Sequence, residues 1–294
     1  MIVTPPNNPS SLSAASSSGR SSNVRRGAFI VFEGVDRCGK TTQVSLIVKH
    51  LLKTLSVGAA AAASGAAGSA AAAAGAAASA AIAMRFPDRT TTIGKMIDTY
   101  LKDSTTTLDD HAIHLLFSAN RWEVVPTLQK HLAEGTTVIC DRYAYSGVAF
   151  SSAKVVGKDT QQPVMSMEWC QNPDVGLPAP DAVIFLDLSQ EEAEKRGGYG
   201  GERYETRDMQ KRVRERFTQL HQRDVQDYGG VVPWHFVNAA RSVDDVHTDI
   251  KQIVETTIQN VQQGGGEGGE NNDSGSKPLQ LLWQKRDDKE NVLN

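Results

Sequence analysis

The feature that most constrains this chain is a glycine-rich turn between a short apolar run and a periodic apolar segment. Residues 29–32 are four consecutive apolar residues, residues 34–41 have the sequence GVDRCGKT, and residues 44–52 carry apolar side chains at helical spacing. This is the G-x-x-x-x-G-K-[ST] pattern between a buried strand and a helix, in which backbone N–H groups surround phosphate oxygens. The sequence therefore predicts a nucleotide-phosphate site. In it Lys40 supplies a cation to the β- and γ-phosphates, and Thr41 supplies a ligand for Mg²⁺.

Apolar runs alternate with helical segments along the rest of the chain. The further predicted strands are residues 82–86, 137–140, 182–186 and 231–237. The predicted helices are residues 90–103, a helix beginning near Asp109 that we expect Pro126 to restart or kink, and residues 190–196, 208–226 and 243–261. Such alternation predicts an α/β fold with a five-stranded parallel sheet and helices on both faces. Ligands are then expected beyond the carboxyl ends of the strands, where the glycine-rich turn and Asp141-Arg142 both lie.

Low-complexity segments divide the chain around one expected domain, residues 27–262. We expect residues 58–81, which are Ala- and Gly-rich, to be an inserted loop, and residues 196–207, around GGYGG, to be a mobile lid. The flanking segments are a Ser-, Pro- and Asn-rich tail (1–26), a Gly-rich linker (263–276), an apolar docking segment (277–285) and a second tail (286–294).

Charge and cysteine content exclude some classes of function. The net charge of -3 argues against non-specific nucleic-acid binding, and no apolar run is long enough to cross a bilayer. The 3 cysteines are widely spaced and form neither a metal pattern nor a disulfide framework. We therefore expect neither nucleic-acid nor membrane partners, and a reducing compartment: the cytoplasm, with a nuclear or organellar pool left open.

A phosphate loop alone does not distinguish a kinase from a GTPase, an ATPase or a sulfotransferase. A guanine-specific GTPase usually has an N-K-x-D base-recognition motif after a late strand, whereas residues 238–241 are NAAR. Arginines instead gather near the predicted strand ends: Arg37, Arg85, Arg89 and Arg142. Transfer of a phosphoryl group between two charged substrates needs such cations, because donor and acceptor phosphates repel each other. This pattern favours a kinase.

Seven motifs carry a family resemblance: FEGVDRCGKTTQ (32–43), RFPDR (85–89), HLLFSANRWE (114–123), DRYAYSGVAF (141–150), PDVGLPAPD (173–181), ERYE (202–205) and KPLQLLW (277–283). In this order they resemble the eukaryotic-type thymidylate kinases, which are P-loop nucleoside monophosphate kinases. The resemblance implies phosphorylation of dTMP to dTDP in dTTP biosynthesis, by direct in-line transfer from ATP with Mg²⁺ as cofactor. It also implies a homodimer, for which residues 93–100 and 109–122 are candidate surfaces.

The resemblance also implies roles for individual residues. The catalytic set is Asp36, Arg37, Lys40 and Arg142. The residues expected at ATP are Arg37, Cys38, Gly39, Lys40, Thr41, Thr42, Arg142, Arg241 and Lys251. Those expected at dTMP are Asp36, Phe86, Arg89, Phe117, Arg121, Arg142, Ser146, Gly147, Tyr204 and Gln210. The expected Mg²⁺ ligands are Thr41 and Asp141.

Some of these roles compete with simpler interpretations. Spacing alone places Phe117 in the core and Arg121 in solvent, whereas the resemblance implies that they stack on thymine and hydrogen-bond its edge. Asp36 either contacts the sugar 3′-hydroxyl or shapes the turn. Arg89 is expected to hold the dTMP phosphate. The resemblance to the eukaryotic-type enzymes implies that the catalytic arginine is Arg37 of the phosphate loop; the lid core has no basic residue, and a supporting role is left open for Arg203.

Three other functions stay open at this stage. The first is a kinase of another nucleotide, since the sequence does not separate dTMP from dUMP. The second is a catalytically weak nucleotide-binding protein whose Ser-rich tail and Ala-rich loop recruit partners. The third is a GTPase switch, which would show guanine selectivity and turnover without an acceptor.

Overall fold

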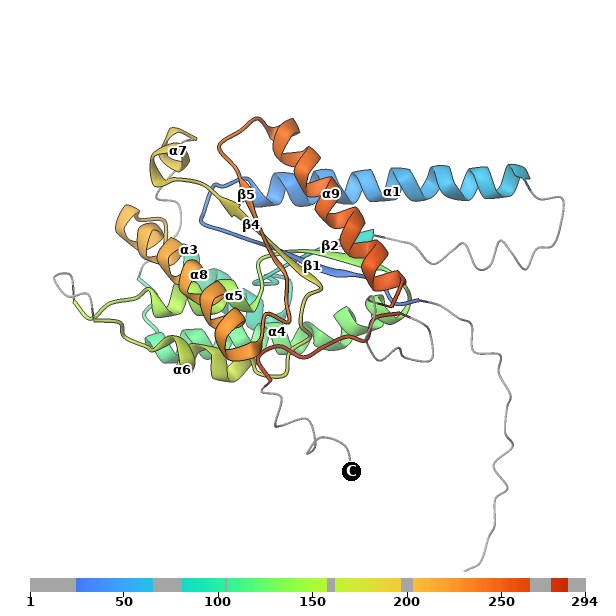
Figure 1. The fold of residues 1–294 in the computed structure, drawn as a ribbon. Coiled ribbons are helices and arrows are strands. Elements are labelled where there is room, and N and C mark those ends of the chain that lie inside the picture. Colours follow the sequence, from blue (N-terminus) through green and yellow to red (C-terminus); the bar gives the residue numbers. More distant parts are fainter. Residues whose placement is uncertain are drawn as a thin grey trace, which may run out of the picture.

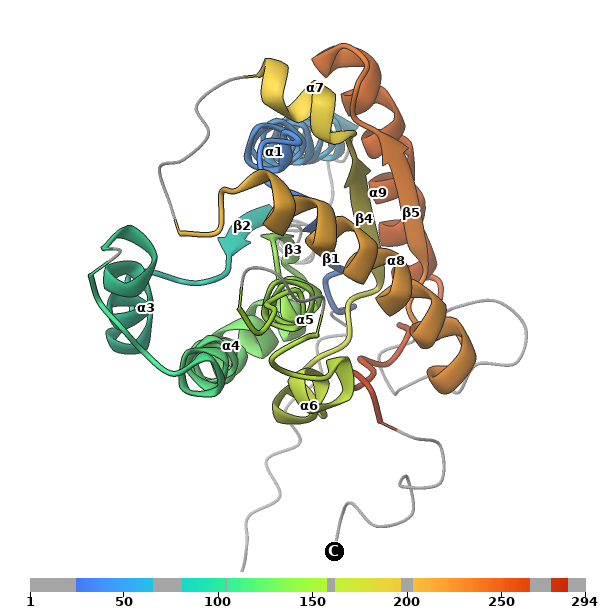
Figure 2. The ribbon, with the colours of Figure 1, turned by 90° about the vertical axis from the view of Figure 1, so that its left-hand side faces the viewer.

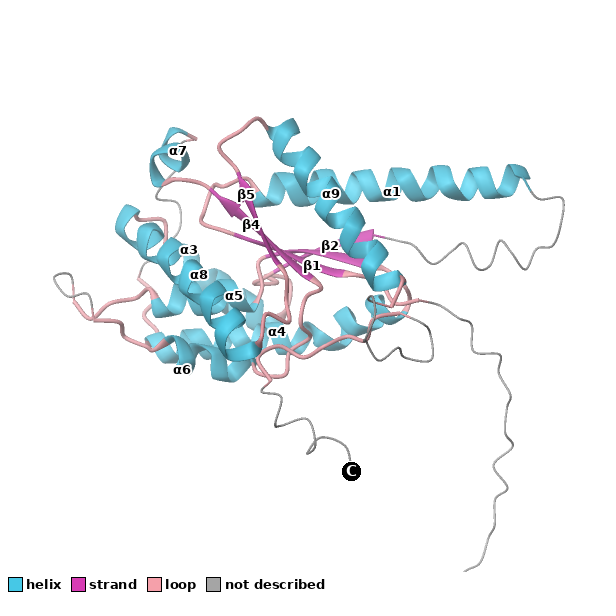
Figure 3. Ribbon diagram, in the orientation of Figure 1, coloured by secondary structure: helices cyan, strands magenta, loops and turns pink. Residues whose placement is uncertain are grey.

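The protein is built on one parallel β-sheet. The computed structural model describes residues 25–65, 81–103, 105–157, 162–196, 203–264 and 276–284. Figures 1 and 3 show this sheet with the helices around it. Its strand order is β2-β3-β1-β4-β5, as Figure 2 shows, and every neighbouring pair is parallel. The strands are β1 (Phe29–Glu33), β2 (Ala81–Arg85), β3 (Thr137–Asp141), β4 (Ala182–Asp187) and β5 (Trp234–Asn238). The predicted fold class is thus confirmed.

Helices connect the strands and cover the sheet. They are α1 (Lys40–Gly65), α3 (Thr92–Lys102), α4 (Asp110–Ala133), α5 (Ala144–Ser152), α6 (Met167–Gln171), α7 (Gln190–Lys195), α8 (Arg207–Tyr228) and α9 (Val243–Gln262), with a 3₁₀ turn at Asn172–Asp174. Among these described helices, none combines the length and the apolar character needed to cross a bilayer.

Both faces of the sheet are buried. In β1, Phe29 and Val31 face a core shared with α4, α5 and α8, whereas Ile30 and Phe32 face a second core shared with α1 and α9. Figure 2 shows these two helical layers on opposite sides of the strands. Because side chains alternate between the two faces, a strand buried on both sides must be apolar throughout, and β1 begins with four such residues. The continuous apolar runs of the sequence have this cause.

Two helices are longer than the sequence pattern indicated. The prediction that Pro126 restarts or kinks its helix is wrong as to a restart, since α4 runs from Asp110 to Ala133 as one element. Buried Val124 and Leu128 on either side of the proline anchor both halves of the helix against the core. The packing therefore offsets the hydrogen bond that proline cannot make.

The Ala-rich insertion begins as helix rather than loop. Helix α1 extends through Gly65, so the expectation of a loop is wrong for residues 58–65, where alanine's high helix propensity continues the preceding turns. The rest of the expected inserted loop (66–80), the GGYGG lid core (197–202), most of the linker (265–275) and most of both tails (1–24 and 285–294) lie outside the described residues.

A segment near the C-terminus, residues 276–284, packs back on the domain. Leu282 and Trp283 are buried, and Trp283 Nε1 donates to Asp224 Oδ1 at 2.9 Å. Burial raises the pKa of Asp224, an effect that the indole donors partly oppose. Arg26 donates to both carboxylate oxygens of Asp181, at 2.8 and 2.6 Å. It also donates to the backbone carbonyl oxygens of Lys277 and Pro278, in the segment 276–284. The beginning and end of the described chain are thus fastened together.

Candidate active site

The phosphate loop turns sharply at the carboxyl end of β1. Gly34 has φ of 140°, and a Cβ atom there would lie 2.7 Å from the Leu186 carbonyl oxygen. Gly39 has φ of 97°. Both backbone conformations strongly favour glycine, so the two glycines of the motif set the path of the loop. The loop then leads directly into the first turn of α1.

Lys40, the first residue of α1, lies folded over this loop. Its Nζ atom donates to the carbonyl oxygens of Gly34 at 3.1 Å and Val35 at 2.7 Å, and lies 3.4 Å from Cys38 Sγ. The side chain is only 5% exposed. The backbone of the loop thus holds a cation at the end of the helix where anionic phosphates are favoured.

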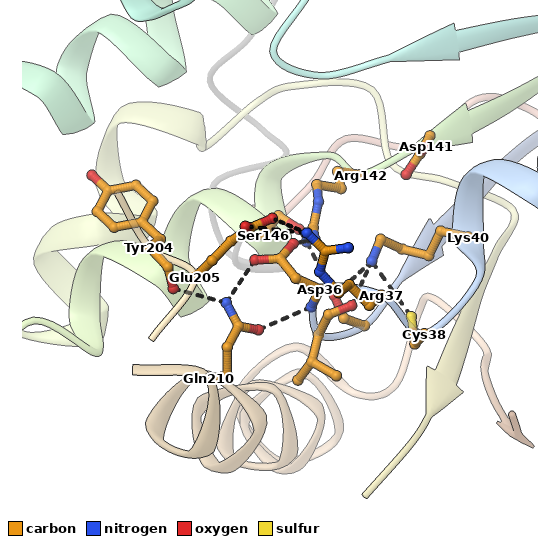
Figure 4. Close-up of polar contacts among 12 residues, drawn as sticks. Asp36, Arg37, Cys38, Lys40, Asp141, Arg142, Ser146, Tyr204, Glu205 and Gln210 are labelled. Carbon is orange, nitrogen blue, oxygen red and sulfur yellow. Dashed lines mark hydrogen bonds and ion pairs between the residues drawn. The ribbon is translucent and has the colours of Figure 1, made fainter. Parts of the chain in front are cut away.

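Arg142 connects this loop to the strand beside it. It follows β3 with φ of 69°, and its Nη1 atom donates to the Gly34 carbonyl and to Ser146 Oγ, both at 3.0 Å. Its Nη2 atom pairs with Asp36, as Figure 4 shows. Burial alone would lower the pKa of Arg142, but nearby carboxylates, led by Asp36, raise it. The guanidinium therefore stays charged inside the site.

Glu33, the last residue of β1, organises the turn that carries Arg142. It is fully buried and accepts from the backbone N–H groups of Tyr143 at 2.9 Å and Ser146 at 3.1 Å. It also accepts from the Ser146 hydroxyl, which in turn accepts from Arg142. Burial raises the pKa of Glu33, although these hydrogen bonds and Arg142 oppose the shift. Sequence analysis missed this residue, because an acidic strand end has no distinctive pattern.

Residues flanking the lid bond the phosphate loop. Gln210 of α8 is fully buried, donates to Asp36 Oδ2 at 2.6 Å and accepts from the Asp36 backbone N–H at 2.9 Å. The same amide nitrogen donates to the Tyr204 carbonyl at 3.0 Å. Glu205 pairs with Arg37 of the loop, with Arg37 Nη2 at 3.3 Å from both carboxylate oxygens (Figure 4). Residues 204–210 and the side chains of Asp36 and Arg37 therefore hold one another in place.

Arg203 binds backbone carbonyl oxygens at the end of α3 and just after it. Its guanidinium donates to the carbonyl oxygens of Tyr100 at 3.1 Å, Asp103 at 2.9 Å and Thr106 at 2.7 Å. Arginine at the end of a helix commonly satisfies such terminal carbonyls. Arg203 thus joins the lid flank to the end of α3 and does not line either cavity described below.

Two oxygen ligands lie together at the end of β3. The Thr41 hydroxyl donates to Asp141 Oδ2 at 2.6 Å, and Asp141 is 4% exposed. Arg85 Nη2 lies 3.3 Å from the hydroxyl and 3.4 Å from the carboxylate. A hydroxyl and one carboxylate fit Mg²⁺, which typically takes few protein ligands and completes its shell with substrate phosphates and water. The residues present thus suit the implied metal.

Two adjacent cavities occupy this edge of the sheet. The larger has a volume of about 730 Å³ and lies over the phosphate loop, and the smaller, of about 100 Å³, lies between α4 and α5. Both are lined by Asp36, Phe86, Pro87, Arg89, Arg142 and Glu205. Two ligands bound in them would therefore meet at these six residues.

Most of the residues expected at the donor nucleotide line the larger cavity. Loop residues 36–42, Arg142 and Arg241 do so, whereas Lys251 of α9 does not. Sequence analysis missed Arg196, which lines the same cavity and donates to the carbonyl oxygens of Arg37 at 3.2 Å and Ala239 at 2.5 Å. Only tertiary contacts distinguish it from an ordinary charged residue at a helix end.

The smaller cavity brings together most residues expected at dTMP. Its walls include the following predicted residues: Asp36, Phe86, Arg89, Phe117, Arg121, Arg142, Ser146, Gly147 and Tyr204. Gln210 is absent from the wall but bonds Asp36. Arg89 Nη1 is held at 2.7 Å by Asp98 of α3.

Two side chains in this cavity differ from what spacing alone indicated. Arg121 is 2% exposed, so the expectation of a solvated arginine is wrong, because the buried carboxylate of Asp174 pairs with it. Phe117 packs on the cluster around Ile97 and also lines the cavity, so its core position is confirmed, while stacking on a base stays a prediction. The Tyr143 hydroxyl, missed by sequence analysis, is buried here without a hydrogen-bond partner among the described residues.

Comparison with known proteins agrees with this geometry. The family model for thymidylate kinase matches residues 71–250. A thymidylate kinase of Danio rerio is 46% identical over 236 residues, which cover 80% of this chain and 93% of the relative. A thymidylate kinase of Homo sapiens is 40% identical over 261 residues, covering 89% and 99% respectively.

A solved structure agrees as well. The thymidylate kinase of Candida albicans, described as having broad substrate specificity, superposes with a TM-score of 0.65 at 33% identity, covering 87% of this chain and 98% of that one. The family model spans more than half of the sequence, and the relatives are matched over nearly their whole length. This chain belongs to the thymidylate kinase family.

Proposed function

We propose that this protein transfers the γ-phosphoryl group of ATP to the 5′-phosphate of dTMP, forming ADP and dTDP. One observation carries the proposal: the cavity over the phosphate loop and the cavity at Phe117 and Arg121 share a wall at Arg142 and Asp36. A phosphoryl donor in the first and a nucleotide acceptor in the second would place their phosphates next to each other. No covalent enzyme intermediate is then required.

The proposed transfer is a single in-line displacement. An oxygen of the dTMP phosphate forms a bond to the γ-phosphorus while the bond from that phosphorus to the bridging oxygen breaks, and this oxygen leaves on ADP. Positioning and electrostatics carry most of the catalysis in such reactions. The loop N–H groups, Lys40 and Arg37 supply positive charge from the larger cavity, and Arg142 supplies it from the wall that both cavities share.

Mg²⁺ would be held by the Thr41 hydroxyl and the Asp141 carboxylate together with nucleotide phosphates. When bound, the ion would neutralise part of the phosphate charge. The chain's own contribution is to hold these two oxygens side by side, 2.6 Å apart.

The acceptor nucleotide would be recognised at three points. Phe117 offers an aromatic face to the base and Arg121 offers N–H donors to its edge, because the two residues are one helical turn apart on α4. Arg89, fixed by Asp98, would bind the monophosphate. Asp36 offers a carboxylate to the sugar hydroxyl, and Gln210 holds that carboxylate in place.

A coupled ADP-release assay tests the reaction. It uses ATP and Mg²⁺ with dTMP, dUMP, dGMP, AMP, CMP, thymidine or no acceptor, and we expect turnover to depend on the acceptor and to be highest with dTMP. A preference for another nucleotide would keep the kinase and discard the assignment of Phe117 and Arg121 to thymine. Turnover without any acceptor, or none at all, would contradict the proposal.

We further propose that the chain forms a homodimer through one face of α4. That face carries an uncharged seam at alternating spacings of three and four residues: Ala112, Leu115, Ala119, Trp122, Pro126, Gln129 and Ala133, with Leu108 just before the helix begins. Leu108, Leu115 and Trp122 are 40%, 47% and 40% exposed. Apolar residues that alternate at spacings of four and three residues are typical of the contact faces of paired helices. The surface predicts a helical partner.

A second copy of the chain fits this seam. If the helix pairs antiparallel with itself about position 117, Leu115 faces Ala119 and Trp122 faces Ala112. Each large side chain then meets a smaller one, as a two-fold self-complementary interface requires.

Introducing charge into the seam should separate the copies. We expect the wild type to have about twice the chain mass of 31.7 kDa by light scattering, and Ala119→Arg to have the monomer mass. Val225→Glu, on the exposed face of α8, is a matched control that should stay dimeric, since Val225 is 53% exposed and outside the seam. A monomeric wild type, or a dimeric Ala119→Arg, would contradict the interface.

A further inference from the structure

The guanidinium of Arg121 is held by a carboxylate outside the cavity wall. Arg121 Nε donates to Asp174 Oδ1 at 3.0 Å, and Nη2 donates to Oδ2 at 2.5 Å. The side chains are 3% and 0% exposed, respectively. Asp174 does not line the cavity, whereas Arg121 does. This bidentate pairing fixes both the position and the roll of the guanidinium plane.

Asp174 is itself fixed to α4. The Ser118 hydroxyl donates to Asp174 Oδ1 at 2.7 Å and lies 3.0 Å from the Pro173 carbonyl. Trp122 Nε1 donates to the same carbonyl at 2.7 Å. The 3₁₀ turn that carries Asp174 is thus bonded to the same helix, at Ser118, three residues before Arg121, and at Trp122, the residue after it. The carboxylate therefore holds its partner from a rigid support.

Helix α5 confines the guanidinium from another side. A Cβ atom at Gly147 would lie 2.8 Å from both Nη1 and Nη2 of Arg121 and 3.0 Å from Cζ. The guanidinium therefore lies in contact with the backbone of α5 at a residue without a side chain. Any larger residue at position 147 would displace it.

One atom of Arg121 remains for a ligand. Nε and Nη2 are engaged by Asp174, whereas Nη1 makes no hydrogen bond within the described parts of the chain. Nη1 carries two N–H donors and no acceptor. It therefore suits a base edge that presents a carbonyl oxygen and opposes one that presents an amino group.

We propose that Asp174 is a positioning residue that sets base selectivity by aiming Nη1 of Arg121 at the 4-carbonyl of the acceptor pyrimidine. This inference rests on the proposed function, because it deepens the role of Arg121 in the dTMP cavity. Without the carboxylate, the guanidinium can turn about its own bonds, and the discrimination between a 4-oxo and a 4-amino pyrimidine is lost. Asp174 acts only through Arg121 and does not touch the nucleotide.

Steady-state kinetics of Asp174→Asn test the proposal, with dTMP and dCMP as acceptors. We expect the KM for dTMP to rise about tenfold or more, as for groups that orient a binding residue, while the KM for ATP stays unchanged. The ratio of kcat/KM for dTMP over dCMP should fall by about the same factor. The apparent kcat at saturating dTMP should change least, because the phosphate-side residues are intact.

A second buried ion pair provides the matched control. Asp181 also binds an arginine, Arg26, through both oxygens, and these side chains are 5% and 9% exposed. Asp181→Asn likewise leaves a buried guanidinium without its carboxylate, but far from the nucleotide cavities. Both variants should melt at lower temperature, whereas only Asp174→Asn should change the dTMP over dCMP ratio.

Two further variants keep the test decisive. Ser118→Ala removes one hydrogen bond to Asp174 and should shift the ratio less, in the same direction, even if Asp174→Asn does not fold. Adding Asp174→Asn to Arg121→Gln should change the ratio no further than Arg121→Gln alone, because the two residues act as one unit.

Two results would overturn the proposal. One is an unchanged dTMP over dCMP ratio in folded Asp174→Asn and in Ser118→Ala, and the other is an equal shift of that ratio in Asp181→Asn. Failure of the proposed function is a separate result, since it would appear in the wild type as turnover that does not require dTMP.

Discussion

Replacing Arg142 with alanine is expected to lower kcat by about 10²–10³, the usual effect of removing one preorganised donor from a charged transition state. Arg142 lies where the two cavities meet, and its charge is maintained by the carboxylates around it. Its side chain is already oriented by Gly34 and Ser146, so little rearrangement is needed at the moment of transfer. Turnover at saturating ATP and dTMP measures the effect.

The backbone at Arg142 must be controlled for, because its φ of 69° is uncommon for a residue with a side chain. Arg142→Gly removes the guanidinium while accepting this conformation, and it should be as inactive as the alanine variant. Arg214→Ala, which removes an exposed arginine paired with Asp187, should keep wild-type turnover. Turnover within a few-fold of wild type in Arg142→Gly would show that the guanidinium is dispensable.

Arg37→Ala is expected to have an effect of similar size, about 10²–10³ in kcat, through a different contact. Arg37 belongs to the phosphate loop and lines the donor cavity, where it pairs with Glu205. Arg37 thus lines only the larger cavity, whereas Arg142 lines both. Single-turnover measurements, in which product release is excluded, separate a slower chemical step from slower release.

A conservative substitution distinguishes the role of Arg37 from loop distortion. Arg37→Lys keeps the charge but not the planar fork, so partial activity is expected, above that of Arg37→Ala. Arg37 has φ of 63°, and Arg37→Gly should leave the loop intact, with ATP affinity close to that of the alanine variant. If Arg37→Gly were fully active, strain rather than charge would account for the loss in Arg37→Ala.

The sequence determined the sheet and the phosphate loop because both depend on local pattern. β1 begins with four apolar residues and β3 has three in a row, Val138, Ile139 and Cys140, because both faces of these strands are covered. Gly34 and Gly39 of the loop have backbone conformations that strongly favour glycine. The parallel order follows from helices that alternate with strands. Helix ends were less predictable, since Pro126 and the alanines before Gly65 are both accommodated within helices.

The residues missed at the site share another property: their partners are distant in the chain. Asp174 lies 53 residues from Arg121, and Glu33 lies 113 residues from Ser146. Periodicity on one helix places Arg121 toward solvent, and only the packed turn at Asp174 reverses that expectation. Pattern analysis finds residues that act through local sequence, whereas residues that hold them become visible only in three dimensions.

The attachment of residues 276–284 has a consequence for the order in which the protein matures on the ribosome. Synthesis proceeds from the N-terminus, and domains fold as units once their sequence has emerged. Trp283, which covers Asp224, and the carbonyl groups that bind Arg26 are among the last described residues to be made. The sheet, whose last strand ends at Asn238, can therefore form before this segment is made, and this edge of the core closes only after Trp283 has been synthesised.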